Sequence, residues 1–181
     1  MKNYFILFAM IPMIISCQNS NYQYSEAESK EFLNEITKNA KASITDITEI
    51  KKLPTDLFGI ITRYPLSKKS LDEFKRNKGT IVNKNDDISD FATYTFKNYE
   101  LINEKNVKLK FVDNGRAIYL QEYGLWDYDK VLCQNLGIEL KLNAHFTKLH
   151  GYMDIEFKMP DGEQKEVKIP VDISVYDKTL E

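Results

Sequence analysis

Histidine is scarce in this chain of 181 residues, which contains only His145 and His150. A histidine-based triad or a typical zinc site would have to use one of them. His145 stands between Ala144 and Phe146 of an alternating run, which places it on the outward side, and His150 falls at the turn that follows. The sequence contains neither HExxH nor GxSxG, and no cysteine or carboxylate stands at ligand spacing beside either histidine. We therefore expect no catalytic residue, no metal and no cofactor.

The sequence also lacks an apolar run long enough to cross a bilayer. Its most hydrophobic stretch covers residues 4–15 and contains Pro12, whereas a membrane-spanning helix needs about 20 apolar residues. The stretch follows a short start with one positive charge, Lys2. This length and order are typical of the core of a signal peptide.

The signal does not end in the small residues at A-x-A spacing that usually mark secretory cleavage. Instead, in the segment MIISCQNS, Ser16 leads directly into Cys17. A charged start, a short apolar run, a small residue and a cysteine in this order resemble the lipobox signal of bacterial lipoproteins. The resemblance covers residues 1–17 only. It implies that residues 1–16 are a signal peptide cleaved between Ser16 and Cys17, and that lipid is attached to the Cys17 thiol and to the new amino terminus.

A lipid on Cys17 would make the mature chain a membrane-anchored protein of the bacterial cell envelope. Two or three acyl chains, palmitate for example, hold a protein stably where one chain does not. Residues 17–24 form a polar tether, whose seven residues after the cysteine span about 15 Å if flexible. Gln18 stands where lipoproteins of the inner membrane carry aspartate, so the resemblance favours the outer membrane in a cell that has one.

The charge balance gives no reason to expect a nucleic-acid partner. Removing the signal takes Lys2 from the 25 basic residues, so 24 face 27 acidic ones and the net charge is −3, whereas nucleic-acid binding usually needs a basic patch. Apart from Cys17, the only cysteine is Cys133, which cannot form an internal disulfide. Its neighbours Val131 and Leu132 indicate a buried, inert thiol.

Residues 25–41 have the pattern of an amphipathic helix. Ser25 and Glu28 stand at the spacing of a capping box. The residues of its predicted apolar face are Ala27, Phe32, Leu33, Ile36 and Ala40. Residues 57–65 are apolar and β-branched enough to form a strand.

A second, shorter helix is predicted over residues 70–77, where Ser70 and Glu73 repeat the capping spacing and Leu71 and Phe74 point inward. The surrounding segment is basic. Its cations are Lys68, Lys69, Lys75, Arg76 and Lys78. They could rest against anionic head groups, but an ordinary charged helix face is favoured, partly because Asp72 and Arg76 can pair at i,i+4.

From about Phe91 the apolar pattern changes to period two, which is typical of a half-buried antiparallel sheet. A hairpin turn is predicted at residues 114–115, another turn near Gly151, and a third at the segment MPDGE. The predicted inward residues of the last three strands are Ile138, Leu140, Leu142, Ala144, Phe146, Met153, Ile155, Phe157, Met159, Val167, Ile169, Val171, Ile173 and Val175. Pro170 falls between inward positions, so its strand should lie at a sheet edge or carry a bulge.

These patterns predict an α+β fold. One or two N-terminal helices would pack on an antiparallel meander sheet of about five to six strands, within a single globular domain of residues 25–181. Ahead of the sheet, residues 83–90 are rich in oxygen-bearing side chains. Ile88 and Tyr94 occupy the positions where a calcium loop needs glycine and glutamate, so a solvated turn is favoured.

The segment QEYGLWDYDK, residues 121–130, holds the clearest candidate binding surface. Its members are Tyr123, Trp126, Asp127, Tyr128 and Asp129. Three interpretations remain open. Trp126 could plug the end of the sheet while the acids cap a helix that starts near Asp129. The aromatic and acidic side chains could instead bind a macromolecule, or two carboxylates about 5–9.5 Å apart could cleave a glycoside.

The sequence therefore predicts a non-enzymatic lipoprotein of the envelope that binds another protein. It would serve as an accessory of a membrane complex or as a protective protein that blocks a toxin. The alternative is a protein that binds or cleaves cell-wall glycans. An exposed Trp126 in a cleft with two acids would favour the glycan alternative, a flatter apolar patch rimmed by charge would favour a protein partner, and a buried Trp126 would weaken both.

Overall fold

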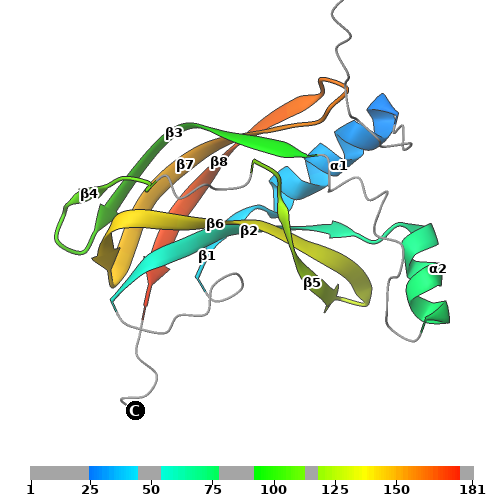
Figure 1. Cartoon of the computed structure of the whole chain (residues 1–181), viewed down its shortest axis with the longest axis horizontal. Coiled ribbons are helices and arrows are strands. Elements are labelled where there is room, and N and C mark those ends of the chain that lie inside the picture. Colours follow the sequence, from blue (N-terminus) through cyan, green and yellow to red (C-terminus); the bar gives the residue numbers. More distant parts are fainter. Residues whose placement is uncertain (1–24, 45–53, 78–91, 113–117, 176–181) are drawn as a thin grey trace, which may run out of the picture.

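The computed structural model describes residues 25–44, 54–77, 92–112 and 118–175, which form two antiparallel sheets and two helices (Figure 1). In chain order the elements are α1 (Glu26–Asn39), β1 (Lys41–Ser43), β2 (Thr55–Pro65), α2 (Lys68–Arg76), β3 (Thr93–Asn103), β4 (Lys108–Leu109), β5 (Gln121–Tyr128), β6 (Val131–Phe146), β7 (Lys148–Lys158) and β8 (Gln164–Ser174). The broad prediction of helices with an antiparallel sheet structure is confirmed. The predicted turns at residues 114–115 and 83–90 lie outside the described residues.

The strands form two four-stranded sheets, so the predicted single meander of five to six strands is wrong. The order is β1-β2-β6-β5 in the first sheet and β4-β3-β7-β8 in the second. β6 is followed after Thr147 by β7, so the chain crosses at this residue from one sheet to the other. Beyond β4, the backbone N–H of Val112 donates to the carbonyl of Lys141 at 2.9 Å, which joins the sheets again. An alternating pattern predicts each strand but does not identify its neighbour.

α1 begins with the predicted capping box. The Ser25 hydroxyl accepts from the Glu28 backbone N–H at 3.3 Å, and the Glu28 carboxylate accepts from the Ser25 N–H at 2.6 Å. Phe32, Leu33 and Ile36 are buried as expected, where α1 packs on β2 and β8. Ala27 and Ala40 are not: Ala27 is exposed and Ala40 half-buried, because the buried face is confined to the middle of the helix.

The first turn of α1 is fixed to the turn between β7 and β8. The Ser29 hydroxyl donates to the Asp161 carboxylate at 2.6 Å, and Lys30 forms an ion pair with Glu163 at 3.6 Å. The chain therefore enters the domain beside this turn. The turn itself is the one predicted from MPDGE, with Gly162 at φ 98°.

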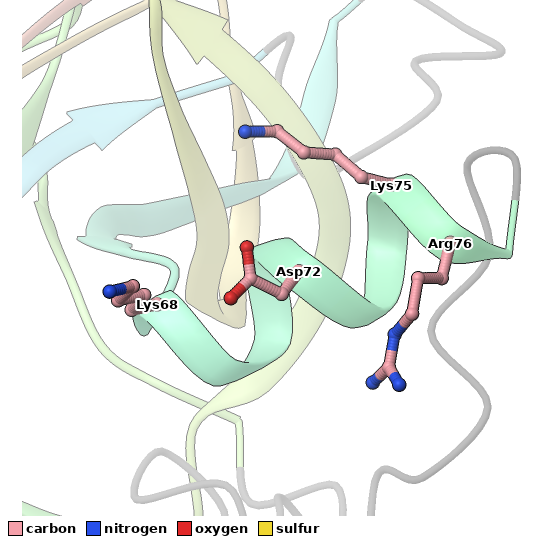
Figure 2. Close-up of a pocket in the computed structure, with 4 residues that line it drawn as sticks. All are labelled: Lys68, Asp72, Lys75 and Arg76. Carbon is pink, nitrogen blue, oxygen red and sulfur yellow. The ribbon is translucent and has the colours of Figure 1, made fainter.

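α2 begins earlier than predicted. The Ser67 hydroxyl accepts from the Ser70 backbone N–H at 3.1 Å, and the Ser67 carbonyl accepts from the Leu71 N–H at 2.9 Å. Ser67 therefore occupies the capping position that the sequence assigns to Ser70, because it offers the same acceptor one turn earlier. Leu71 and Phe74 are half-buried, and Figure 2 displays Lys68, Asp72, Lys75 and Arg76 of this helix. Of the two described helices, α1 makes the extensive contacts with the strands, and α2 stands at the rim.

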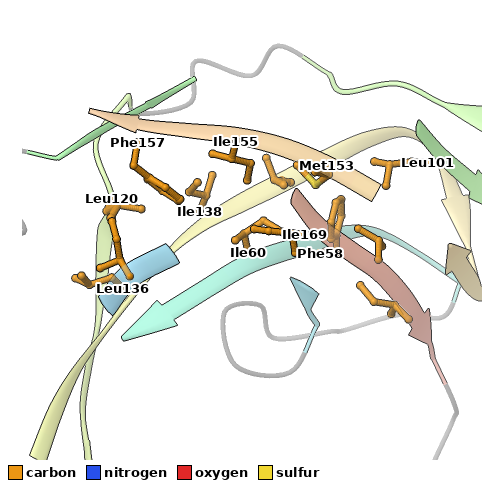
Figure 3. Packing of buried hydrophobic residues seen from close by; sticks show 14 of the residues in the cluster. Phe58, Ile60, Leu101, Leu120, Leu136, Ile138, Met153, Ile155, Phe157 and Ile169 are labelled. Atoms are coloured by element: carbon orange, nitrogen blue, oxygen red, sulfur yellow. The ribbon is translucent and has the colours of Figure 1, made fainter. Parts of the chain in front are cut away.

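The hydrophobic core lies between the two sheets, where side chains of β2 and β6 meet those of β7 and β8 (Figure 3). All fourteen inward positions predicted for the last three strands belong to this core or pack against it. Pro170 is exposed on β8, the edge strand of the second sheet, as predicted. An edge strand tolerates proline because one side of its backbone needs no ladder partner.

The predicted turn near Gly151 is wrong. The chain reverses at Thr147, while Gly151 lies inside β7 opposite Leu101 of β3. Its φ is 139°, and a Cβ added there would stand 1.8 Å from the carbonyl oxygen of Glu100. This glycine is thus a point of close backbone approach, which a sequence pattern does not distinguish from a turn. His150 is consequently a strand residue, not a turn residue, and is exposed.

Glu104 secures the crossing from β6 to β7. Its carboxylate accepts from the backbone N–H groups of Thr147 at 3.0 Å and Lys148 at 3.3 Å. The hydrogen bond from Thr147, then that from its own backbone N–H, lowers the pKa of Glu104 to about 2 from its usual 4.5. Because the folded chain binds this proton less readily than the unfolded chain, the stabilisation is present above pH 4.5 and is lost as the pH falls towards 2.

Glu104→Gln should therefore make folding less sensitive to acid. We expect the melting temperature of the wild type to fall further between pH 6 and pH 2.5 than that of the variant, as followed by circular dichroism. Glu166→Gln removes an exposed carboxylate from β8 and serves as the control. Equal acid sensitivity of Glu104→Gln and the wild type would contradict the assigned role.

Candidate functional site

β5 is the terminal strand of the first sheet, and its residues Trp126 and Tyr128 lie on the sheet face that points away from the core. In the register with β6, Trp126 lies opposite Cys133 and Tyr128 lies opposite Val131. Facing residues of an antiparallel pair share one face. The core residue Leu136 belongs to the other parity of β6. Trp126, Tyr128 and Val131 are therefore on the outer face.

Trp126 is open to solvent. Its side chain is 53% exposed, and that of Val131, at the start of β6, is 48% exposed. The interpretation in which Trp126 plugs the end of the sheet is therefore wrong. Burial of an indole stabilises a fold, so an exposed tryptophan on an edge strand needs another explanation.

The acids after Trp126 shape a turn and do not cap a helix. β5 ends at Tyr128 and β6 begins at Val131, with Asp129 and Lys130 at φ 52° and 70° between them. The Asp127 carboxylate accepts from the Lys130 backbone N–H at 2.7 Å. Residues 129–130 thus form a tight hairpin turn, and the helix expected near Asp129 does not exist. A short polar run after a strand fits either structure, so pattern alone was not decisive.

Tyr128 is held in a fixed position. The Arg63 guanidinium lies 3.9 Å from the centroid of its ring, and its hydroxyl donates to the Asn135 side-chain oxygen at 2.9 Å. Arg63 pairs with Asn135 across β2 and β6, so three strands contribute to this contact. A cation over an aromatic face attracts it electrostatically. We call Arg63, Trp126, Tyr128 and Val131 the β5 surface.

Tyr123 has a different environment from Trp126. It lies at an irregularity in the register between Glu122 and Gly124, is half-buried, and donates its hydroxyl hydrogen to the Gln121 side chain at 3.0 Å. Burial, and then the negative charge of Glu139, raise the pKa of Tyr123 to about 12. The phenol is therefore neutral at physiological pH and serves as a packing and hydrogen-bonding group.

The remaining sequence candidates lie elsewhere. His145 is exposed on the outward side of β6, as predicted. Cys133 is only 3% exposed, which confirms the prediction of a buried thiol, and burial raises its pKa although the nearby positive charge of Arg63 opposes this. In the described ranges, no three histidine, cysteine or acidic side chains are grouped as metal ligands would be. Nor does any helix in those ranges have the length and apolar character of a membrane span.

Sequence reasoning identified Trp126 and Tyr128 but missed Arg63 and Val131. The only signal for Arg63 was its place as the one cation of a largely apolar strand, and the pairing of β2 with β6 is what brings it to Tyr128. No family model, no curated protein and no solved structure matches this chain. The function must therefore be argued from the site itself.

Proposed function

We propose that this protein is a lipid-anchored lipoprotein of the bacterial envelope whose domain binds another protein through the β5 surface. The observation that carries the proposal is the exposure of Trp126 on the edge strand of a sheet. Tryptophan, tyrosine and arginine are the residues most enriched among those that dominate binding energy in protein interfaces. The β5 surface contains one of each.

The edge position of β5 supports a protein partner further. A terminal strand presents backbone groups that an added strand can pair with, and many recognition domains bind peptides in this way. Exposed apolar side chains stand near both ends of β5. They are Ile118 and Tyr119 before it and Val131 after it. A partner strand laid along β5 would find apolar contacts near both ends of the strand and at Trp126.

Two roles need only such binding. A membrane-complex accessory would hold its partner near the bilayer, and a protective protein would cover the active surface of a toxin. Both fit a lipid anchor at Cys17, because the anchor confines the domain to the membrane that the partner approaches. By resemblance to other lipoproteins, Gln18 favours the outer membrane for this anchor, in a cell that has one.

Cell-wall glycans are the second candidate, because the exposed Trp126 lies next to Asp127 and near Asp129. Sugar rings stack on aromatic faces while carboxylates bind their hydroxyls. Two contacts make this candidate weaker: Arg63 covers a face of Tyr128, and Asp127 accepts a hydrogen bond from the hairpin turn. Trp126 is then the main stacking platform on this surface.

Affinity capture from a detergent extract of the envelope tests the proposal. The tagged full chain should capture one protein in stoichiometric amount, and Trp126→Ala should reduce that capture at least tenfold, since truncating a central aromatic anchor costs about 2 kcal/mol or more. Val107→Ala is the matched control, because Val107 is 50% exposed but lies outside the β5 surface. Capture of glycan fragments would favour the second candidate, and equal capture by Trp126→Ala and the wild type would refute the β5 surface.

A further inference from the structure

α2 presents a cationic surface. Lys68, Lys75 and Arg76, with the single acid Asp72, line a hollow of about 880 Å³ among the described residues (Figure 2). All four side chains are exposed. Three positive charges against one negative charge make the described lining of this hollow attractive to anions.

Lys68, Lys75 and Arg76 form no ion pair with another described residue. Figure 2 shows the Arg76 side chain directed away from Asp72, and the predicted pair between them does not form. Within the described part of the chain, none of the ion pairs involves Lys68, Lys75 or Arg76. Several lysines elsewhere do have carboxylate partners. They are Lys30, Lys38, Lys97, Lys108 and Lys141. The absence of the Asp72–Arg76 pair removes one of the reasons to expect an ordinary charged helix face.

α2 lies at the end of the molecule where the chain enters the domain. Along the longest axis, Figure 1 shows α2 and the first turn of α1 at one end and β4 at the other. The Leu66 backbone N–H donates to the Leu132 carbonyl at 3.0 Å, which ties the start of α2 to the beginning of β6. α1 is capped by Ser25, and Cys17 stands eight residues earlier. That length spans at most about 29 Å even when fully extended.

We propose that α2 binds anionic phospholipid head groups and so turns this end of the domain towards the membrane. The inference rests on the proposed lipid anchor at Cys17. Attraction to an anionic bilayer acts only within about 10 Å, so cations are effective only on a surface held close to it. Each lysine or arginine there strengthens binding about fivefold. The lipid anchor already holds the domain at the membrane, so contact between α2 and the head groups is intramolecular in effect. Three cations are therefore enough to orient the domain.

Amine reactivity of the full lipidated chain tests the orientation. The protein is inserted into vesicles of phosphatidylcholine alone, or of phosphatidylcholine and phosphatidylglycerol at about 7:3, and acetylated with a water-soluble reagent. Mass spectrometry then gives the rate at each lysine. We expect acetylation of Lys75 to be at least fivefold slower in the anionic vesicles. Lys105, which is exposed in the turn between β3 and β4 at the opposite end, should react equally in both.

A pair of double variants separates α2 from general charge effects. Lys75→Gln with Arg76→Gln should weaken the contact about 25-fold, since two cations are lost, and the protection of Lys68 in anionic vesicles should disappear. Lys105→Gln with Lys110→Gln removes two exposed cations at the other end and should leave Lys68 protected. Circular dichroism of both variants verifies that the fold is retained.

Each contrary result has a distinct meaning. Equal reactivity of Lys75 in the two kinds of vesicle would overturn membrane contact through α2. Protection of Lys75 in neutral vesicles by inorganic phosphate, at matched ionic strength, would show that the hollow takes a soluble anion and would also overturn it. Flotation with neutral vesicles tests the anchor separately: a chain that does not float overturns anchor and orientation together, whereas a floating chain with reactive Lys75 overturns only the orientation.

Discussion

Gly151→Ala is expected to lower the free energy of unfolding by about 3 kcal/mol or more. The new methyl group would stand 1.8 Å from the backbone carbonyl oxygen of Glu100, and the residue would have to keep a φ of 139°. A backbone atom cannot rotate aside as a side chain can. β3 and β7 would therefore have to separate at the centre of the second sheet, beneath the buried Leu101 and Met153.

Gly162→Ala distinguishes the two causes of the loss in unfolding free energy, the clash with a neighbouring strand and the backbone strain at positive φ. Gly162 also has a positive φ, 98°, but no heavy atom beyond its own residue and its two chain neighbours lies within 4 Å of its added Cβ. The free energy of unfolding of Gly162→Ala should therefore fall only by the cost of backbone strain, about 1–2 kcal/mol. Urea unfolding of both variants, followed by circular dichroism, provides the comparison. If Gly151→Ala were no less stable than Gly162→Ala, the close approach of β3 and β7 would not be the constraint on this residue.

Cys17→Ala is expected to abolish lipid attachment completely. Only a thiolate is a competent nucleophile for the thioether, so no neighbouring residue can substitute. Cells grown with labelled palmitate should incorporate label into the wild type and none into the variant, and the variant should migrate as the larger chain that still carries residues 1–16.

Cys133→Ala is the matched control for lipid attachment. Its thiol is buried in the first sheet, and burial raises its pKa, so it offers no accessible thiolate. The Cys133→Ala variant should therefore be labelled as strongly as the wild type. Label that persists in Cys17→Ala, or that disappears from Cys133→Ala, would refute the lipobox interpretation.

The strand pattern was the most predictable part of the fold. In β6, β7 and β8 every second residue faces the core, and the period of two is a direct consequence of strand geometry. The capping box at Ser25 and the edge position of Pro170 were predictable for the same reason, because each depends on local backbone chemistry. Features that depend only on neighbouring residues can be predicted from a short segment of sequence.

The arrangement of the strands was not predictable in this way. The division into two sheets depends on which strands pair, and the pairing of β3 with β7 also explains why Gly151 is required. Likewise, Asp127 was recognised as a candidate, but its role in the turn before Val131 depends on a backbone conformation with positive φ at two successive residues. These features arise from contacts between distant segments or from loop geometry that several sequences share.

In the candidate site too, residue types could be read from the sequence, whereas exposure and contacts between strands depend on the fold. Trp126 was singled out because of its residue type, and its exposure became known only from the fold. The Arg63 contact with Tyr128 joins residues from two strands that a third strand separates in the sheet. On α2, the pairing of Asp72 with Arg76 was reasonable from spacing alone, but the side chains adopt other directions. Surface side chains are the least constrained by sequence pattern.

Partner binding through the β5 surface is tested most directly by crosslinking in living cells. A photo-reactive amino acid is placed at Val131, which is exposed beside Tyr128, or at His145, which is exposed farther along β6. We expect a single discrete protein adduct from position 131 and none from position 145. No protein adduct from position 131, or the same adduct from both positions, would contradict a partner-binding surface at β5.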